Sequence, residues 1–314
     1  MKKLLYITPH LSTGGMPQYL LKKIQLLKDE FDIYCIEYVF RAAAYVVQRE
    51  QIVNLLGDKF HTLEYCPKEN MLNIIDHIKP DIIHFEEFPE IFLKYEIAEK
   101  IYEKSRKYLL FETYHGIYLK PENKRFFPDK FLFVSQKQAD LYGNFGVPYD
   151  IVEYPIEFKK PNKKDAQKIL NFDPNCKHVV NVGLFTSGKN QGELIEYAKK
   201  MTDDNVLFHF VGNQASNFEL YWKPLMKSLP KNCKIWGERN DTDLFYQASD
   251  LMVFTSKMEA SPLVIREAIS WNLPSLFYDL PAYTKMYDEF QSIGYLKFGD
   301  TDYNLKKIKE LLYI

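Results

Sequence analysis

Residues 251–268 read LMVFTSKMEASPLVIREA, an apolar run followed by a polar loop and the start of a helix. The run Leu251–Phe254 has the length and composition of a buried strand. Ser261-Pro262 predicts that a helix begins there, with Ser261 as the N-cap and Pro262 at the first helical position. Glu259 is then expected in the loop at the carboxyl end of the strand, and Glu267 in the second turn of the helix.

This arrangement predicts a binding site for a sugar attached to a nucleoside diphosphate. The amino end of a helix carries a partial positive charge and unpaired N–H groups, which suit a phosphate. Glu259 and Glu267 are carboxylates, which accept hydrogen bonds from the hydroxyls of a sugar. One glutamate would lie at the mouth of the helix and the other deeper along it.

Short apolar runs alternate with helical patterns along the whole chain, which predicts an α/β fold with parallel, doubly wound sheets. The 314 residues correspond to about two domains of ordinary size. A polar segment with two prolines, residues 154–164, is typical of a linker, so the predicted domains are residues 1–155 and 156–314. Contact of its lysines with an anionic lipid or partner, and hence a peripheral membrane contact, stays open.

The predicted strands are Leu4–Ile7, Ile33–Val39, Asp81–Phe85, Tyr108–Phe111, Phe131–Val134, Ile151–Glu153, Val179–Val182, Val206–Val211, Cys233–Trp236, Leu251–Phe254 and Ser275–Phe277. Predicted helices of the first half are Tyr19–Lys28, Tyr45–Leu56, Met71–Ile78 and Ile91–Ser105.

Composition argues against several classes of protein. A net charge of −1 gives no general attraction to nucleic acid. The four cysteines are far apart and form no C-x-x-C pair, which favours a reducing cytoplasm and no zinc site. The opening MKKLLYI breaks at Thr8-Pro9-His10, too early for a signal peptide, and no run reaches the about 20 apolar residues of a membrane span. A cytoplasmic protein is expected.

A second candidate loop lies in the same half of the chain. Residues 181–191 read NVGLFTSGKNQ, a strand end, a loop with two glycines and a helix start. Gly183 would let backbone N–H groups approach a phosphate, and Lys189 would supply positive charge. An ordinary loop with a solvated lysine is the alternative. The glutamate loop in the same domain favours the binding site, because both loops open at the carboxyl ends of parallel strands.

The first half contributes weaker signals. Gly14-Gly15 follows the first strand without the G-x-G-x-x-G spacing of a dinucleotide site, so close approach to a ligand and a plain tight turn both stay open. His115 lies on a strand-end loop before a glycine, where a site histidine and a structural histidine are both compatible with the pattern. His84, inside an apolar run, is interpreted as structural.

Two D-x-D triplets are interpreted as helix caps. Asp241 and Asp243 precede an apolar helical segment, and Asp300 and Asp302 precede the last helix. No histidine pair has the spacing of metal ligands, so we assign no metal and no cofactor. A metal-dependent transferase that uses Asp241 and Asp243 remains an alternative.

Together these residues resemble the GT-B retaining glycosyltransferases of family 4. Glu259 and Glu267 match the family's E-x7-E signature, and Gly183 and Lys189 match the glycine and lysine of its V-G-R-L-x-x-x-K-G segment. Gly14-Gly15 and His115 stand where the family has a glycine pair and a first-domain histidine. The match covers almost the whole chain in order. It implies two facing Rossmann-like domains with a cleft between them that closes during the reaction.

The resemblance also implies a role for each residue. Glu267 would hold the ribose hydroxyls, Glu259 would contact the donor sugar, and Lys189 would neutralise the departing diphosphate. Gly183, Gly14 and Gly15 would border the donor, and His115 would touch the donor sugar from the opposite domain. The backbone of Ser261, Pro262 and Leu263 would face the diphosphate.

The chain departs from the family pattern at position 184 and in the segment 260–262. Leu184 stands where the family has an arginine, so one cation for the diphosphate is missing. Arg266 is not expected to replace it, because adjacent helical residues face apart and Glu267 faces the site. Ala260 to Pro262 replace residues that are usually rich in glycine.

The sequence therefore predicts a hexosyltransferase that is retaining and metal-independent. Its donor would be a nucleotide sugar, and its acceptor a hydroxyl on a glycan, lipid-linked glycan or other glycoconjugate. The alternative from another class is a catalytically silent relative that binds a nucleotide sugar or a partner, which Leu184 favours.

Overall fold

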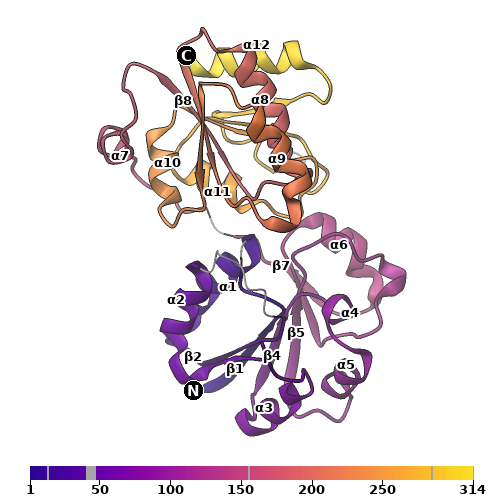
Figure 1. Cartoon of the computed structure of the whole chain (residues 1–314). Helices are drawn as coiled ribbons and strands as arrows, with labels where there is room; N and C mark the ends of the chain where they lie inside the picture. Colours follow the sequence, from indigo (N-terminus) through magenta and orange to yellow (C-terminus); the bar gives the residue numbers. More distant parts are fainter. Residues whose placement is uncertain (13, 40–46, 155, 284–285, 314) are drawn as a thin grey trace. The chain divides into compact units, whose positions relative to one another are not determined.

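The computed structural model describes residues 1–12, 14–39, 47–154, 156–283 and 286–313. The chain folds as two compact units, Met1–Glu153 and Tyr154–Ile314, here called unit 1 and unit 2 (Figure 1). The predicted domain boundary falls on residue 155, which lies outside the described residues.

Unit 1 is built on a parallel sheet of seven strands in the order β3-β2-β1-β4-β5-β6-β7. The strands are β1 (Lys2–Thr8), β2 (Phe31–Glu37), β3 (Phe60–Thr62), β4 (Ile82–Glu86), β5 (Leu109–Thr113), β6 (Lys130–Phe133) and β7 (Tyr149–Ile151). The helices are α1 (Gly15–Leu27), α2 (Val47–Leu56), α3 (Asn70–Ile78), α4 (Pro89–Phe92), α5 (Tyr95–Tyr102) and α6 (Gln136–Tyr142).

Unit 2 has a parallel sheet of six strands in the order β10-β9-β8-β11-β12-β13. The strands are β8 (Lys177–Val182), β9 (Val206–Val211), β10 (Cys233–Gly237), β11 (Leu251–Phe254), β12 (Ser275–Tyr278) and β13 (Ile293–Leu296). The helices are α7 (Lys163–Leu170), α8 (Gln191–Lys200), α9 (Glu219–Lys227), α10 (Thr242–Ala248), α11 (Leu263–Ser270) and α12 (Thr301–Leu312). Helices flank this sheet on both faces (Figure 1).

In both sheets the order of the strands reverses beside the first strand of the unit. The reversal lies between β1 and β4 in unit 1 and between β8 and β11 in unit 2. Loops diverge at such a switch point, and ligands of doubly wound proteins bind there, outside the carboxyl ends of the strands. The loops that follow β8 and β11 carry Lys189 and Glu259.

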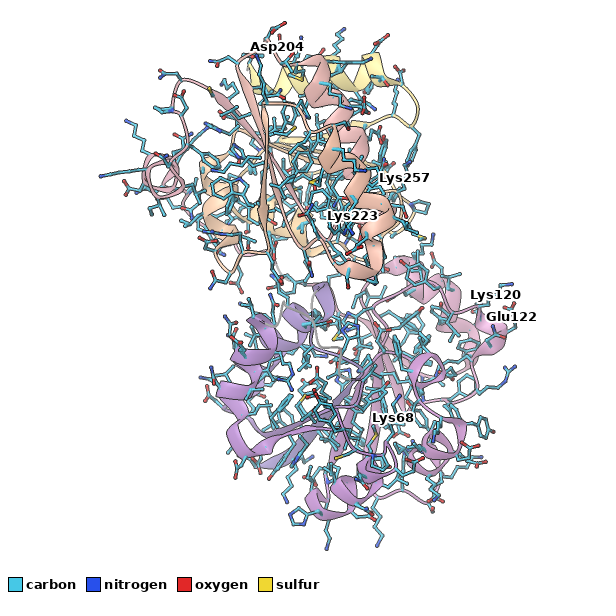
Figure 2. All side chains as sticks on the ribbon, viewed as in Figure 1. Lys68, Lys120, Glu122, Asp204, Lys223 and Lys257 are labelled. Atoms are coloured by element: carbon cyan, nitrogen blue, oxygen red, sulfur yellow. The ribbon has the colours of Figure 1, made fainter. Side chains whose placement is uncertain are left out.

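The central strands are apolar on both faces because both faces are covered. In β1, Leu5 and Ile7 pack into one core and Leu4 and Tyr6 into another, so neighbouring residues serve opposite faces of the sheet. Each fully buried leucine or isoleucine contributes about 1.5–3 kcal/mol. Exposed charged side chains, labelled in Figure 2 at Lys120, Glu122, Lys223 and Lys257, lie outside these cores. Among the described residues, no helix is long and apolar enough to cross a membrane.

The α/β fold with two doubly wound units is confirmed, and β9 and β11 have the predicted bounds. Two edge strands, β3 and β13, were not predicted, because they are short and their residues are mostly half-buried. The prediction of a single helix over Ile91–Ser105 is wrong. The structure has α4 and α5 instead, separated by Leu93-Lys94 in extended conformation. The predicted start of the helix Tyr45–Leu56 lies outside the described residues, which resume at α2.

The predictions of helix caps are wrong for α11 and α10 and right for α12. Helix α11 begins at Leu263, so Pro262 is the N-cap and Ser261 is not, and no side chain caps this helix. Asp241 occupies the N-cap position of α10 but does not cap it, because its carboxylate is held by Arg239. Asp300 caps α12 as predicted, accepting from the backbone N–H of Tyr303.

A chain of hydrogen bonds with two buried histidines at its centre crosses the core of unit 2. Trp236 Nε1 donates to His209 Nδ1 at 3.1 Å, and His209 Nε2 lies 2.9 Å from His178 Nδ1. His178 Nε2 lies 2.8 Å from the carbonyl oxygen of Asp173. Because the indole can only donate and the carbonyl can only accept, the chain has one consistent assignment: each imidazole is neutral and carries its proton on Nε2.

Protonation would break this chain. Burial, and to a smaller extent the neighbouring His178 and Lys234, lower the pKa of His209 to about 3. Burial also lowers the pKa of His178. A histidine whose pKa is lowered by folding stabilises the protein above the unfolded pKa of about 6.5, and this stability is lost as the pH falls below it.

His209→Gln tests this linkage, since glutamine can accept from Trp236 and donate to His178 without titrating. Between pH 7 and pH 5 we expect the wild type to lose about 2 kcal/mol of unfolding free energy relative to the variant, because the unfolded state alone takes up the proton. Urea unfolding followed by tryptophan fluorescence measures this in unit 2, which contains all three tryptophans. Parallel pH curves for the two proteins would contradict the neutral assignment.

Candidate functional site

The loop between β8 and α8 begins where the ends of β8 and β9 lie close together. The N–H of Gly183 donates to the carbonyl oxygen of Val211 at 2.9 Å, and the N–H of Gly212 donates to the carbonyl oxygen of Gly237 at 2.8 Å. The hydrogen bonds between neighbouring strands therefore continue past the ends of β8 and β9. A Cβ on Gly212 would lie 2.0 Å from the carbonyl oxygen of Gly183, and Gly212 has a φ of 150°. This position therefore requires glycine.

Lys189 closes the same loop. Its stem passes Gly183, since a Cβ there would lie 3.8 Å from Lys189 Cδ. Its ammonium lies 2.5 Å from Glu259 Oε1 and 5.1 Å from the centre of the Phe254 ring. The lysine side chain is 29% exposed and the glutamate side chain 10% exposed, so the pair is only partly buried.

Glu259 is oriented by its own loop, which follows β11. Ser256 Oγ donates to the same Glu259 oxygen at 2.5 Å, so this oxygen accepts from both the serine and Lys189. Ser256 was not singled out in the sequence, although a serine three residues before a candidate carboxylate in one loop is a usable signal.

Main-chain contacts tie the two loops together. Thr255 Oγ1 donates to the carbonyl oxygen of Asn190 at 2.9 Å, and the N–H of Lys257 donates to Gly188 at 2.9 Å. The loops after β8 and β11 are thus joined at the switch point, and the structure brings Gly183, Lys189 and Glu259 together there.

Glu267 lies in the second turn of α11, as predicted, and is half-buried. The hydroxyl of Tyr246, a buried residue of α10, donates to Glu267 Oε2 at 2.7 Å. Tyr246 fixes the carboxylate from a different helix. No sequence signal links the two residues, because their contact exists only in the fold.

Helix α11 presents its amino end at this edge without a side-chain cap. Its N-cap is Pro262. At the start of α8, in contrast, the N–H of Gly192 donates to the Tyr221 hydroxyl at 2.9 Å. Ser261 is half-buried, whereas Pro262 and Leu263 are buried. The uncapped start of α11 leaves backbone N–H groups for an anion, in line with the predicted place of a diphosphate.

The structure explains why Arg266 does not replace the missing arginine at position 184. Arg266 is buried, donates to the main-chain oxygen of Tyr154 at 2.5 Å and contacts Met286 Sδ at 3.2 Å. Leu184 offers only its carbonyl oxygen, which accepts from Gln191 at 2.9 Å. Lys189 is thus the cation that the glycine loop brings to Glu259.

The first D-x-D triplet is occupied by other partners. Asp241 accepts two hydrogen bonds from Arg239, at 2.8 and 2.6 Å. Asp243 accepts from the Trp271 indole at 2.9 Å and from Lys159 at 3.2 Å. Within the described ranges there is no group of three or more acidic, histidine or cysteine side chains that suits a metal ion.

In unit 1 the predicted residues lie at the switch point of the first sheet. Gly14, with a φ of 126°, directly precedes α1, and Gly15 is its first residue. His115 follows β5, and its Nε2 lies 2.8 Å from Glu86 Oε2 at the end of β4. His84 is buried in β4 and contacts Thr113 Oγ1 at 2.8 Å, in line with its interpretation as a structural residue.

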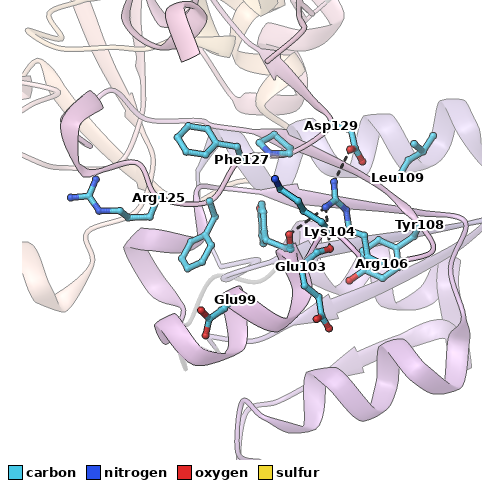
Figure 3. A pocket seen from close by; sticks show the side chains of 12 residues that line it. Glu99, Glu103, Lys104, Arg106, Tyr108, Leu109, Arg125, Phe127 and Asp129 are labelled. Carbon is cyan, nitrogen blue, oxygen red and sulfur yellow. Dashed lines mark hydrogen bonds and ion pairs between the residues drawn. The ribbon is translucent and has the colours of Figure 1, made fainter. Parts of the chain in front are cut away.

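A groove of about 710 Å³ lies elsewhere on unit 1, near the starts of β5 and β6 (Figure 3). Its central cation, Arg106, is held by Asp129 at 2.6 Å and by the main-chain oxygens of Tyr102 and Glu103, both at 3.3 Å. The Asp129 carboxylate neutralises the arginine, and the groove lies at the amino ends of the strands. We do not assign it to the predicted site.

Comparison with solved structures defines the class of fold. The chain superposes over its full length on 90% of Anabaena HepE in complex with UDP and glucose, with a TM-score of 0.80 and 16% sequence identity. It also superposes on WaaG, a glycosyltransferase involved in lipopolysaccharide biosynthesis, with a TM-score of 0.66 and 12% identity, over 99% of this chain and 90% of that one. The two doubly wound units are those of the GT-B glycosyltransferase fold.

Sequence comparison relates unit 2 to a family of glycosyltransferases. Residues 162–312, just under half of the chain, match the model of the glycosyl transferases group 1. The processive diacylglycerol alpha-glucosyltransferase of Acholeplasma laidlawii is 26% identical over 168 residues, which are 52% of this chain and 48% of that relative. The amylovoran biosynthesis glycosyltransferase AmsD of Erwinia amylovora is 28% identical over 101 residues, 32% of this chain and 29% of that one. The matches thus span half or less of these curated relatives.

Gly212→Ala tests the close approach of the two strand ends. We expect it to lower the unfolding free energy of unit 2 by about 3 kcal/mol, because the new methyl group overpacks the Gly183 carbonyl and the backbone conformation is unfavourable. Gly237→Ala is the matched control. Gly237 also has a positive φ, 67°, but nothing lies within 4 Å of its Cβ position, so about 1 kcal/mol is expected. Equal losses in urea unfolding would show that the carbonyl contact is unimportant.

Proposed function

We propose that the chain transfers a sugar from a nucleoside diphosphate donor to a hydroxyl of a glycan, lipid-linked glycan or other glycoconjugate. The transfer is proposed to retain the anomeric configuration and to need no metal ion. The observation that carries the proposal is the Lys189–Glu259 ion pair, which joins the two loops of the switch point in unit 2.

The two partners of this ion pair have the chemistry that a donor site needs. A diphosphate that reaches Lys189 competes with Glu259 for the ammonium, since both are anions. Once released, the Glu259 carboxylate can accept hydrogen bonds from sugar hydroxyls, and Ser256 still holds it in place. The exchange is feasible because the pair is partly exposed and therefore screened by water.

The reaction breaks the bond between the anomeric carbon and the diphosphate oxygen and forms a bond from that carbon to the acceptor oxygen. The electron pair of the broken bond and the acceptor proton leave with the nucleoside diphosphate. Catalysis then depends on stabilising the charge that develops on the leaving group. Lys189 and the uncapped amino end of α11 supply this stabilisation.

Glu267 is proposed to hold the ribose of the nucleotide. Tyr246 donates to one of its oxygens and so fixes the direction in which the carboxylate faces. A ribose with two adjacent hydroxyls can donate to a carboxylate in this arrangement.

The names of similar proteins suggest where to begin the search for substrates. HepE was crystallised with UDP and glucose, so UDP-glucose is the first donor to test. The curated relatives include a diacylglycerol glucosyltransferase and an enzyme of amylovoran biosynthesis, which supports lipid and polysaccharide acceptors.

A catalytically silent relative is the second candidate. Leu184 favours it, because the loop after β8 then contributes Lys189 as its sole cation within residues 183–190. Such a protein would bind a nucleotide sugar at the same residues without turning it over.

Glu267→Ala should weaken binding of the nucleotide by roughly 10- to 100-fold, because charge-assisted hydrogen bonds to the ribose are lost. Tyr246→Phe is the graded comparison, since it keeps the carboxylate and removes only the group that orients it, so a smaller loss is expected. Titration calorimetry in EDTA with UDP, GDP and ADP measures both variants and identifies the base. Unchanged binding in Glu267→Ala would remove Glu267 from the site.

Lys189→Met should lower the turnover number about 100-fold, because the leaving diphosphate loses its counter-charge. Lys223→Met, at an exposed lysine of α9 in the same unit, is the matched control and should leave turnover unchanged (Figure 2). Release of nucleoside diphosphate from the donor, with and without EDTA, measures both variants. Binding of the donor without turnover in the wild type would favour the silent relative, and activity only with added Mn²⁺ would contradict the metal-independent reaction.

A further inference from the structure

Asn190, the residue after Lys189, has an unusual conformation for the start of a helix. It is the N-cap of α8, but its backbone is left-handed, with a φ of 55° and a ψ of 39°. An asparagine N-cap normally has extended backbone angles, and its side-chain oxygen accepts from the first turn. Asn190 makes no such hydrogen bond, and its side-chain amide donates to Glu193 Oε2. The side chain therefore acts as a donor to Glu193 and not as a cap.

The left-handed backbone makes this hydrogen bond important for the loop. A residue with a side chain adopts that conformation only at a cost, although asparagine tolerates it better than most residues. The family segment V-G-R-L-x-x-x-K-G has a glycine at this position, directly after the lysine. Asn190 replaces the glycine with a side chain that is tied to Glu193. The tie holds the side chain and, with it, the backbone of the residue.

Glu193 is itself held firmly. It lies in the first turn of α8 and is half-buried. The hydroxyls of Tyr197, one turn further along α8, and of Tyr278 in β12 both donate to Glu193 Oε1. Both tyrosines are buried, and the Tyr197 hydroxyl accepts in turn from Asn304 of α12 at 2.9 Å. One oxygen of the carboxylate is thus fixed by the core of unit 2, and the other is presented to Asn190.

The turn at Asn190 determines where the side chain of Lys189 begins. The N–H of Lys189 donates to Thr186 Oγ1 at 3.2 Å, and the N–H of Asn190 donates to the carbonyl oxygen of Thr186 at 3.0 Å. Thr255 Oγ1 lies 2.9 Å from the carbonyl oxygen of Asn190 and 3.3 Å from that of Lys189. Because the two residues share both neighbours, a change of the backbone at Asn190 displaces Lys189, whose ammonium lies 2.5 Å from Glu259.

We propose that Glu193 is a positioning residue for Lys189. Held by the two tyrosines, it fixes the left-handed turn at Asn190 and thereby the place of the ammonium. This inference rests on the proposed function, in which Lys189 neutralises the departing diphosphate. A counter-charge stabilises a developing charge only from the right place, so loss of the positioning lowers turnover although the lysine is still present.

The position of Lys189 can be measured without any substrate. Its ammonium lies 5.1 Å from the centre of the Phe254 ring, so the ring current should displace the ¹H resonance of the neighbouring Cε methylene group. Full-length protein with ¹³C-labelled lysine gives these resonances, and Lys189→Met identifies the one that belongs to Lys189. In Asn190→Gly and in Glu193→Met we expect this resonance to move toward those of exposed lysines. An unchanged resonance in either variant overturns the proposal, whether or not the chain proves to be a glycosyltransferase.

The two variants break the same hydrogen bond in different ways. Asn190→Gly removes the amide and leaves a residue that adopts the left-handed conformation freely, so the fold should be kept. Glu193→Met keeps the length of the side chain and removes both acceptor oxygens. Glu193→Gln is unsuitable, because its amide can turn round, accept from Asn190 and donate to the tyrosines. Glu196→Gln is the matched control, since this exposed glutamate of α8 pairs with Lys199 at 2.6 Å, and it should leave the Lys189 resonance and turnover unchanged.

Kinetics then separate positioning from a structural role. Each single variant should lower kcat about 10-fold. Asn190→Gly combined with Glu193→Met should lower kcat no further than Glu193→Met alone, because both changes break one hydrogen bond. In the Lys189→Met background neither change should lower kcat again, since the group that they position is gone.

Losses that multiply in either combination would overturn the proposal and indicate a merely structural role for Glu193. Absence of turnover with any donor in the wild type would instead refute the proposed function, and the Lys189 resonance would still decide whether Glu193 positions the lysine.

Discussion

The reversal of strand order beside the first strand of each unit is the constraint on which both candidate sites depend. Parallel strands need crossover connections, and where the order reverses the crossovers leave to opposite faces, so the loops separate. In unit 2 the separated loops follow β8 and β11, and they bring Lys189, Glu259 and the uncapped start of α11 to one place. In unit 1 the same reversal places the glycine pair after β1 and Glu86 at the end of β4.

Each switch point holds a lysine paired with a glutamate, but the two pairs differ in burial. The Lys189–Glu259 pair is 29% and 10% exposed, so water and a ligand can reach it. The Lys23–Glu86 pair is 15% and 0% exposed, and its carboxylate is also held by His115. A charge pair that solvent reaches can exchange partners at small cost, whereas a buried pair is costly to break. The first pair suits a binding role and the second a supporting role.

The sequence predicted the central strands and the two glutamates because these depend on local patterns, an apolar run and a fixed spacing along one loop and helix. It did not predict β3 or β13, whose few residues at the sheet edges are mostly half-buried and show no continuous apolar run. The break between α4 and α5 was also missed, since the apolar spacing continues across it.

Contacts between distant elements could not be predicted from the sequence, because no local pattern indicates them. Tyr246 and Glu267 meet across two helices, and nothing in their spacing indicates it. Glu86 and Glu112 look alike in the sequence, each near the end of an apolar strand. Yet one holds His115 and the other lies in a buried cluster with Lys124 and Tyr102.

The hydrogen-bonded chain from Trp236 through His209 and His178 to the Asp173 carbonyl has a consequence for how these positions evolve. All of its bonds run in one direction, from an end that can only donate to an end that can only accept. A phenylalanine in place of either histidine would leave a hydrogen-bond donor without a partner on one side and an acceptor without a partner on the other. The positions are therefore expected to change together during evolution, so that homologues carry either the whole set or an apolar replacement of it.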